Sequence, residues 1–370
     1  MSDFINKLLD GVAVEWKVLG DISNLQRGKR LVKSQLEDVG TYAVFQNSMT
    51  PLGYYHESNV KADTTFVIAA GAAGEVGYSD VGFWAADDVY YFLPSSVIKH
   101  KYLYHFLLTK KNEISFRVRR ASVPRLSKEV ILKLQIPIPC PDNPNKSLEI
   151  QSEIVRILDT FTELTAELTA ELTARTKQYN YYRDQLLTFE EGQVAWKTLG
   201  EIAEIGTGSH DTQDAIQDGD YVFYARGREA LRLDKFDFDE TAIITAGDGA
   251  GVGKVFHYAQ GKYALHQRAY RIVPSEVMEP RFVYHYIASY FYAYIQKVSV
   301  SSSVTSLRRP MLLKFPIPVL SLSEQIRIVT ILDKFDALTN SITEGLPREI
   351  ELRQKQYEYY REMLLTFPKS

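Results

Sequence analysis

The stretch TAGDGAGVGKV, Thr245–Val255, is the part of the sequence most similar to a nucleotide-binding loop. A P-loop needs a glycine five residues before its Gly-Lys pair and a hydroxyl residue directly after it. Here Asp248 stands five places before Gly253, and a valine follows Lys254. The spacing of a dinucleotide-binding turn also fails, because Val252 stands where the third glycine is required. We therefore interpret the segment as a glycine turn between strands, where the backbone can approach another surface closely.

Metal and covalent chemistry also lack the residue spacing that they need. The seven histidines are scattered, and the single cysteine, Cys140, cannot complete a metal site or form an internal disulfide. The sequence contains no Gly-x-Ser-x-Gly, and we interpret the serine-rich stretch 299–306 as a loop. We therefore expect no catalytic residue and no metal site in this chain.

Basic residues that could contact phosphates gather in four loops that also contain glycine or serine. These loops are RGKR at 27–30, RVRRASVPR at 117–125, RGR at 226–228 and SVTSLRR at 303–309. Such loops can reach phosphates and base edges, although a solvated surface charge is the competing interpretation for any single residue. The net charge of −3 provides no overall attraction to nucleic acid, so binding would depend on these local clusters.

An internal repeat indicates how these loops are carried. Four segments return in the second half: VEWKVLGDI (14–22) as VAWKTLGEI (194–202), IPIP (136–139) as FPIP (315–318), IVRILDTF (154–161) as IVTILDKF (328–335), and KQYNYYRDQLLTF (177–189) as KQYEYYREMLLTF (355–367). Between these segments the halves agree much less, although ASVPRL at 121–126 aligns with SSVTSL at 302–307. The repeat is nearly circular, because the C-terminal segment ends where the N-terminal one begins. Two similar units therefore hold a common frame and display different loops.

Periodicity divides each half into a domain and a helix. Residues 16–146 and 190–320 combine short apolar and aromatic runs with glycine and proline, which predicts two mixed, mainly β domains. Residues 147–189 contain neither Gly nor Pro and carry apolar residues at alternating three- and four-residue steps, which predicts a long coiled-coil helix. Residues 321–370 repeat this pattern, but the EGLP sequence at 344–347 should break or kink the second helix.

Two further features concern the location of the chain. No segment approaches 18 uninterrupted apolar residues, so we expect no membrane span. The N-terminal segment, 1–15, begins MSDFINKLLDG and lacks a basic region followed by a long apolar run. We therefore expect a cytoplasmic protein.

The two halves resemble the specificity subunit of a type I restriction-modification system. The resemblance rests on IPIP and FPIP, which are followed by helices containing EIQSEIVRILD (149–159) and LSEQIRIVTILD (322–333), and it covers essentially the whole chain. The TAEL repeat followed by KQYNYYRDQLL is similar to the type IC subgroup. The resemblance implies an α+β fold with two tandem target recognition domains. It also implies that the two long helices form an antiparallel coiled-coil spacer in a pseudo-twofold arrangement.

The resemblance further implies a noncatalytic chain that recognises double-stranded DNA. Each domain would read one half of a split, asymmetric target, and the helices would dock two methyltransferase subunits, through which restriction/translocase subunits join. In the family, S-adenosylmethionine, ATP and magnesium belong to these partner subunits, so we expect no cofactor in this chain. A standalone restriction or methyltransferase enzyme is one alternative. A coiled-coil scaffold that binds only proteins is another.

In that family the loop after the first tyrosine-containing strand faces DNA, which here corresponds to FQNS at 45–48 and YARGRE at 224–229. These loops, the glycine turns and the basic clusters supply the expected DNA contacts: Gln46, Asn47, Arg27, Lys29, Arg30, Gly71, Gly74, Arg119, Arg120, Arg125, Arg226, Arg228, Gly249, Lys254, Ser303, Arg308 and Arg309. Leu164, Leu168 and Leu172 of the TELTAELTAELTA stretch are expected to belong to the spacer. Each four-residue unit would lengthen a helix by about 6 Å, so this stretch should act as a ruler.

Overall fold

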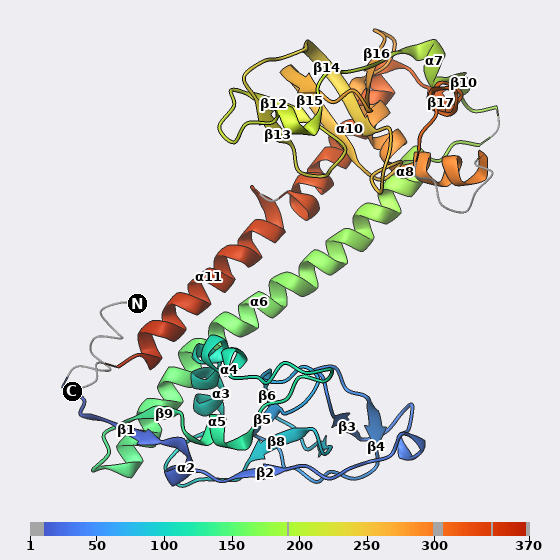
Figure 1. The fold of residues 1–370 in the computed structure, drawn as a ribbon. Helices are drawn as coiled ribbons and strands as arrows, with labels where there is room; N and C mark the ends of the chain where they lie inside the picture. The colour runs from blue at the N-terminus through green and yellow to red at the C-terminus, as the bar shows by residue number, and fades with distance from the viewer. Residues whose placement is uncertain (1–10, 191, 299–305, 342, 368–370) are drawn as a thin grey trace. The chain divides into compact units, whose positions relative to one another are not determined.

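The computed structural model, drawn in Figure 1, describes four stretches of the chain: residues 11–190, 192–298, 306–341 and 343–367. The chain divides into two compact units, which are residues 1–169 together with 349–370, and residues 170–348. Each unit contains one repeated domain and parts of the long helical segments. The C-terminal residues complete the first unit, in agreement with the nearly circular repeat.

The first unit contains a two-stranded antiparallel ribbon, in which β1 (Val14–Val18) pairs with β9 (Gln135–Pro139), and two further sheets. The four-stranded sheet has the order β2 (Leu25–Arg27), β8 (Val89–Phe92), β5 (Thr64–Ile68), β6 (Val76–Ser79). The three-stranded sheet has the order β4 (Gly53–Tyr55), β3 (Tyr42–Phe45), β7 (Trp84–Ala85). Strand β5, TTFVI, is buried throughout, as its β-branched and aromatic residues favour.

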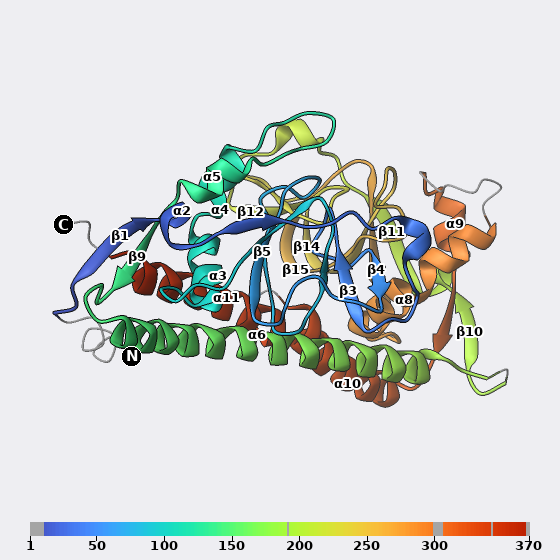
Figure 2. The ribbon, with the colours of Figure 1, turned by 90° about the horizontal axis from the view of Figure 1, so that it is seen from below.

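Short helices complete this domain. They are α2 (Leu19–Ile22), the 3₁₀ helix Lys33–Gln35, α3 (His100–Thr109), α4 (Lys111–Phe116) and α5 (Lys128–Leu132). The last strand, β9, leads into the long helix α6, and the β1/β9 ribbon lies beside the first turns of that helix in both Figure 1 and Figure 2.

The second unit repeats this plan with one larger sheet. Its two-stranded antiparallel ribbon pairs β10 (Ala195–Thr198) with β17 (Pro316–Val319). The six-stranded sheet has the order β11 (Ala203–Thr207), β16 (Ala269–Pro274), β14 (Phe238–Ala246), β15 (Phe256–Leu265), β12 (Tyr221–Tyr224), β13 (Leu231–Leu233). Its helices are α7 (Leu199–Ile202), the 3₁₀ helix Thr212–Asp214, α8 (Pro280–Val298) and α9 (Arg309–Leu313). The predicted mixed, mainly β domains are confirmed in both halves.

The long helices match the periodicity but differ at their ends. The central helix α6 spans Pro144–Leu187 and begins three residues before the predicted start. The side chain of Asn143 accepts a hydrogen bond from the Lys146 amide at 3.1 Å, and proline is well suited to the first helical turn. The distal segment forms α10 (Leu322–Asn340) and α11 (Gly345–Leu365). The predicted break at EGLP is therefore confirmed.

Aromatic contacts between the helical segments occur within each unit. In the first unit, Phe161 of α6 stacks on Tyr360 of α11 with ring centroids 5.1 Å apart. In the second, Tyr182 of α6 stacks on Phe335 of α10 at 5.6 Å. Residue numbers rise along α6 while those of its partners fall, so the pairing is antiparallel. These Tyr and Phe residues, which lie in the repeated segments, thus join helix to helix in each unit.

A buried glutamine anchors each long helix to its domain in the same way. Gln151 accepts a hydrogen bond from the Lys99 amide at 2.9 Å and donates one to the Val97 carbonyl at 3.0 Å. Gln325 makes the equivalent bonds, at 2.8 Å from the Glu279 amide and 3.1 Å to a backbone carbonyl. A buried amide with such partners fixes the position of the helix, because leaving either group unpaired is costly.

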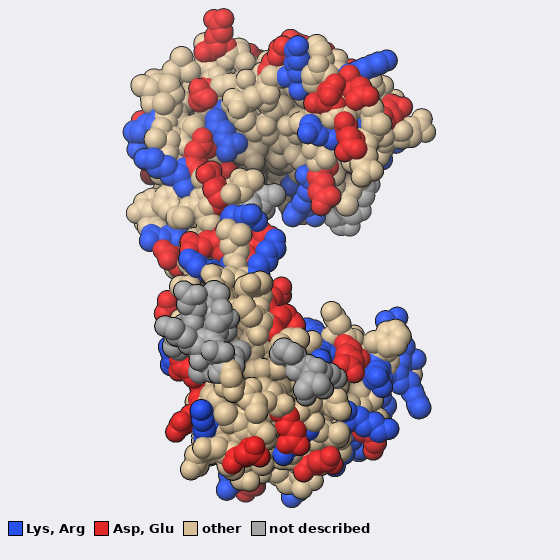
Figure 3. Space-filling view, turned by 90° about the vertical axis from the view of Figure 1, so that its left-hand side faces the viewer, with Lys and Arg blue, Asp and Glu red and all other residues tan. Residues whose placement is uncertain are grey.

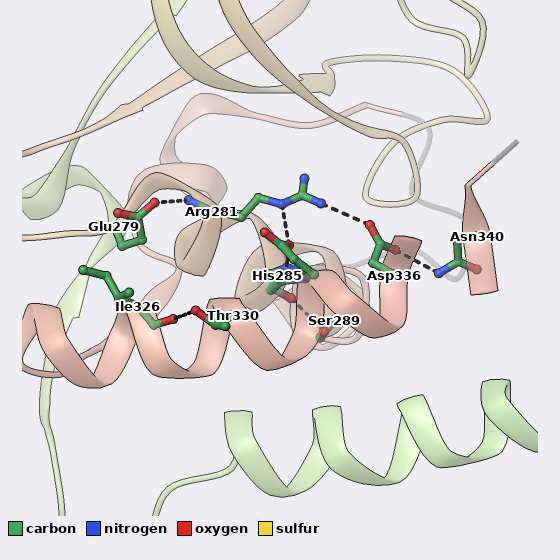
Figure 4. Close-up of polar contacts among 9 residues, drawn as sticks. Glu279, Arg281, His285, Ser289, Ile326, Thr330, Asp336 and Asn340 are labelled. Atoms are coloured by element: carbon green, nitrogen blue, oxygen red, sulfur yellow. Dashed lines mark hydrogen bonds and ion pairs between the residues drawn. The ribbon is translucent and has the colours of Figure 1, made fainter. Parts of the chain in front are cut away.

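A histidine and an aspartate form a second repeated anchor. His105 Nε2 lies 3.2 Å from an Asp159 oxygen, and its Nδ1 lies 2.9 Å from the hydroxyl of Tyr357. In the second unit His285 Nε2 lies 2.7 Å from Asp333, and Arg281 joins the cluster through Asp333 and Asp336. Figure 4 shows Arg281 and His285 projecting from α8 toward α10. These polar groups hold α3 against α6, and α8 against α10.

The first of these histidines should make stability depend on pH. Burial lowers the pKa of His105, which outweighs the opposing effect of Asp159. Below the unfolded histidine pKa of about 6.5, the unfolded chain binds a proton that the folded chain does not. The free energy of unfolding should therefore fall as the pH drops through the unfolded pKa of about 6.5, as urea titrations would measure. His105→Gln should reduce this loss. An equal pH dependence in the variant would contradict the assignment.

Candidate nucleic-acid interface

In the first unit, arginines from three segments line one pocket. Arg27 comes from β2, Arg117 and Arg119 follow α4, and Arg125 precedes α5. Asp88 also lines this pocket, with its carboxylate 3.9 Å from Arg27 Nη2. Because the four arginines are exposed and face a single carboxylate, the pocket has an excess of positive charge. Figure 3 shows Lys and Arg side chains gathered along the right-hand edge of the first unit, which lies in the lower part of that view.

The backbone presents these arginines on a small hairpin that rests on a glycine turn. The amides and carbonyls of Arg119 and Arg125 exchange hydrogen bonds of 2.9 and 3.1 Å. The Gly71 amide donates to the Pro124 carbonyl at 3.1 Å. Gly71 has φ of +81°, and a Cβ there would lie 2.6 Å from the carbonyl oxygen of Asn47. The turn therefore requires glycine and brings three sequence-predicted positions, Asn47, Gly71 and Arg125, to one place.

In the second unit a charged pocket lies between the β12–β13 loop and the β14–β15 turn. Arg226, Arg228 and Lys254 supply its positive charge, and Asp248 lies among them. Nη1 of Arg226 donates to one oxygen of Asp248 at 3.0 Å, and Nη1 of Arg268 donates to the other oxygen at 3.0 Å. Burial tends to raise the pKa of the Asp248 carboxyl, but these hydrogen bonds outweigh it and hold the pKa below its ordinary value. The carboxylate is charged at neutral pH.

Two backbone hydrogen bonds show that the pockets share one frame. The Ala69 amide donates to the Asp88 carbonyl at 2.7 Å, and the Gly247 amide donates to the Arg268 carbonyl at 2.8 Å. The Leu126 amide donates to the Ala69 carbonyl at 2.8 Å, and the Leu307 amide donates to the Gly247 carbonyl at 2.8 Å. These main-chain hydrogen bonds are thus the same in both units, whereas the side chains at the matching positions differ, with Asp88 in the first unit and Arg268 in the second.

Other predicted residues have varied environments. Gly249 has φ of +83° and lines the second pocket, where a Cβ would have open space. Gly74 instead packs against Ile114 and Val118, so its place is structural. Arg309 donates from Nη2 to the Ile205 carbonyl at 2.9 Å and thereby ties α9 to β11.

The remaining predicted contacts lie near the pockets or on the surface. Lys29, Arg30, Arg120 and Arg308 are exposed, whereas Gln46 is half-buried beside Asn47. Ser303 lies outside the described residues. Leu164, Leu168 and Leu172 occupy successive turns of α6, each half-buried.

Sequence reasoning missed the charged partners that complete each pocket. Asp88 and Arg268 were not among the expected contacts, whereas Asp248 was included only through the glycine turn at 247–254 and Arg117 only through its basic run. Arg268 occupies the backbone position of Asp88, and because Asp88 was itself not expected, the alignment of the halves carries no signal for Arg268. The bridge between Arg268 and Asp248 depends on the pairing of β14 with β16, which the sequence does not show.

The Thr245–Val255 segment connects β14 to β15, which confirms the turn interpretation. Among the described residues, no group of three or more His, Cys, Asp or Glu side chains could hold a metal ion. None of the helices within the described stretches is long and apolar enough to cross a membrane.

Comparison with known proteins identifies the family. The model for the type I restriction modification DNA specificity domain matches the chain twice, at residues 12–178 and 193–352. The chain belongs to this family. It is 41% identical over 406 aligned positions to the type I restriction enzyme EcoR124I/EcoR124II specificity subunit of Escherichia coli, covering 99% of this chain and 97% of that protein. It is 33% identical to a putative type I restriction enzyme specificity subunit of Haemophilus influenzae, with 98% of each chain covered.

Solved structures agree on the fold of this type I specificity subunit. The crystal structure of the S subunit from M. genitalium matches with a TM-score of 0.71 at 17% identity, covering 97% of this chain and 98% of that one. The predicted α+β architecture of two recognition domains with long helices is therefore confirmed, as is the family suggested by the sequence. The subunit is a noncatalytic DNA-recognition component that acts in a complex with other restriction-modification subunits. A standalone enzyme or a protein-only scaffold is accordingly not favoured.

Proposed function

We propose that residues 16–146 and 190–320 each read one half of a bipartite, asymmetric DNA target through the two charged pockets. One observation carries this proposal: the same backbone frame presents different side chains in the two units. Asp88 occupies the backbone position of Arg268, and the loop containing Asn47 corresponds to the loop containing Arg226. A common frame with different side chains suits two half-sites of different sequence, since side chains meeting base edges supply specificity.

We also propose that the helices set the spacing between half-sites and dock two methyltransferase subunits. The repeated anchors of α3 on α6 and of α8 on α10 support this, because two similar faces suit two copies of one partner. The restriction/translocase subunits would join through the methyltransferases. The relatives' names describe type I restriction enzymes, in keeping with this assembly.

The DNA-binding pocket of the second domain can be tested with Arg226→Ala combined with Arg228→Ala. Each lost base contact should cost about 1–3 kcal/mol, and each lost phosphate contact should reduce the salt slope of binding by about one. Affinity would be measured by fluorescence anisotropy with the assembled methyltransferase complex at several salt concentrations. Arg327→Ala removes an exposed arginine of α10 and serves as the matched control. Unchanged affinity and slope in the double variant would contradict the proposed interface.

A further inference from the structure

We propose that Asp248 is a positioning residue that fixes Arg226 and Arg268 in the orientation with which the second domain reads its half-site. This inference rests on the proposed DNA-binding role of the second pocket. It adds a residue whose charge opposes DNA binding and whose contribution would be to sequence specificity.

The geometry places the carboxylate between two guanidinium groups that come from separate segments. Arg226 follows β12, Asp248 follows β14, and Arg268 precedes β16. Each Asp248 oxygen accepts one hydrogen bond of 3.0 Å, so the two arginines are held by a single side chain. The Asp248 side chain is 23% exposed, whereas those of Arg226 and Arg268 are 42% and 65% exposed. The carboxylate therefore lies beneath the groups that solvent, or DNA, can reach.

The remaining donors of both arginines are suited to base recognition. A guanidinium has five N–H groups, and the bonds to Asp248 use Nη1 of each arginine. The Nη2 and Nε edge can still form the two parallel bonds with which arginine recognises guanine O6 and N7. Ordering a long side chain on binding costs conformational entropy, and a pre-formed bridge reduces this cost.

The other half of the chain indicates that the fold itself does not require this bridge. Asp248 makes a β-bridge with Ser306, and Ala70 makes the equivalent bridge with Arg125. The first unit therefore has a methyl group where the second has a carboxylate. Its own acidic residue, Asp88, stands instead at the backbone position of Arg268, near Arg27. Each unit thus has a carboxylate among arginines, but at a different backbone position, which favours a role in specificity.

The charge of Asp248 gives the proposal a distinctive signature. A carboxylate near a phosphate backbone is repelled, so it weakens the sequence-independent part of DNA binding. Asp248→Asn keeps the size of the side chain but removes its charge and replaces one acceptor oxygen with an amide donor. The variant should therefore bind nonspecific DNA as well as or better than the wild type, while its preference for the proper second half-site declines.

The experiment uses the full chain assembled with its methyltransferase subunits. Methylated positions are mapped on genomic DNA, and affinities are measured for the mapped target and for a duplex with a scrambled second half-site. Asp248→Asn should lower the specific-to-nonspecific ratio at least tenfold and relax the second half-site while leaving the first unchanged. Asp218→Asn, which removes an exposed acidic charge from the same unit, should change neither the ratio nor the half-site.

Arginine variants distinguish the failure of this inference from failure of the proposed interface. If Arg226→Ala with Arg228→Ala leaves the second half-site and affinity unchanged, the proposed interface itself is wrong. If the arginine variants impair recognition while Asp248→Asn keeps both the wild-type ratio and half-site, only the positioning role is overturned. A parallel loss of specific and nonspecific affinity in Asp248→Asn, with lower stability of the second unit, would also overturn it by showing a structural role.

Discussion

Deleting residues 165–168, one TAEL unit, should move modification to a target with the same half-sites and a shorter unread spacer. Four residues lengthen a helix by about 6 Å, close to two base-pair steps at about 3.4 Å each. They also turn the helix by about 40° beyond one full turn. We therefore expect a spacer one or two base pairs shorter and loss of methylation at the original target. Mapping methylated positions in cells that carry the system would measure this.

The repeat should tolerate the deletion because its neighbours can take over the local contacts. Thr165 and Thr169 each donate a hydrogen bond to the carbonyl four residues earlier, at 2.8 and 2.7 Å. After the deletion, Leu172 would occupy the helical position of Leu168. The matched control keeps the length: Glu163→Ala with Glu167→Ala changes exposed side chains only and should keep the original target. Altered half-sites in the deletion variant, or an unchanged spacer, would contradict the proposal that the length of this repeat sets the spacer.

The sequence predicts the architecture well because the internal repeat marks the segments that pack together, which local hydrophobic patterns do not show. The repeated segments form the contacts that hold each unit together: a strand of the two-stranded ribbon, a helix anchored to its domain, or an aromatic contact between helices. The break at Gly345 followed from backbone chemistry alone. The observed start of α6 lies three residues before the predicted one because the side chain of Asn143 caps the helix.

Individual site residues were harder to predict because sequence shows charge but does not show pairing. Arg226 and Arg228 were expected from their basic cluster, and both line the second pocket. The same reasoning chose Arg309, whose guanidinium bonds the Ile205 carbonyl. It missed Arg268, which reaches Asp248 only because sheet pairing brings their segments together. A count of basic residues thus finds the loops, but tertiary contacts decide which side chains face the pocket.

Replacing Leu364 with alanine should destabilise the first recognition domain, although the substitution lies near the C-terminus. Leu364 is fully buried in the core of the first unit, together with Tyr102, Phe106 and Ile154. Truncating a buried leucine to alanine costs about 2–5 kcal/mol, because apolar contacts are lost and a cavity remains. Hydrogen exchange should therefore show weaker protection in β5 and α3, while the second unit keeps its protection.

An equivalent substitution tests the second unit. Leu187, at the end of α6, is buried in the core of the second unit, so Leu187→Ala should weaken protection in β14 and α8 instead. Leu352→Ala is a matched control on α11, because that side chain is 47% exposed and its truncation should cost little. Loss of protection in the same unit for both Leu364→Ala and Leu187→Ala would contradict the assignment of these two leucines to different cores. The expected outcome would instead show that the end of α11 completes the core of the first domain and that the end of α6 completes the core of the second. The stability of each domain would then depend on a long helix.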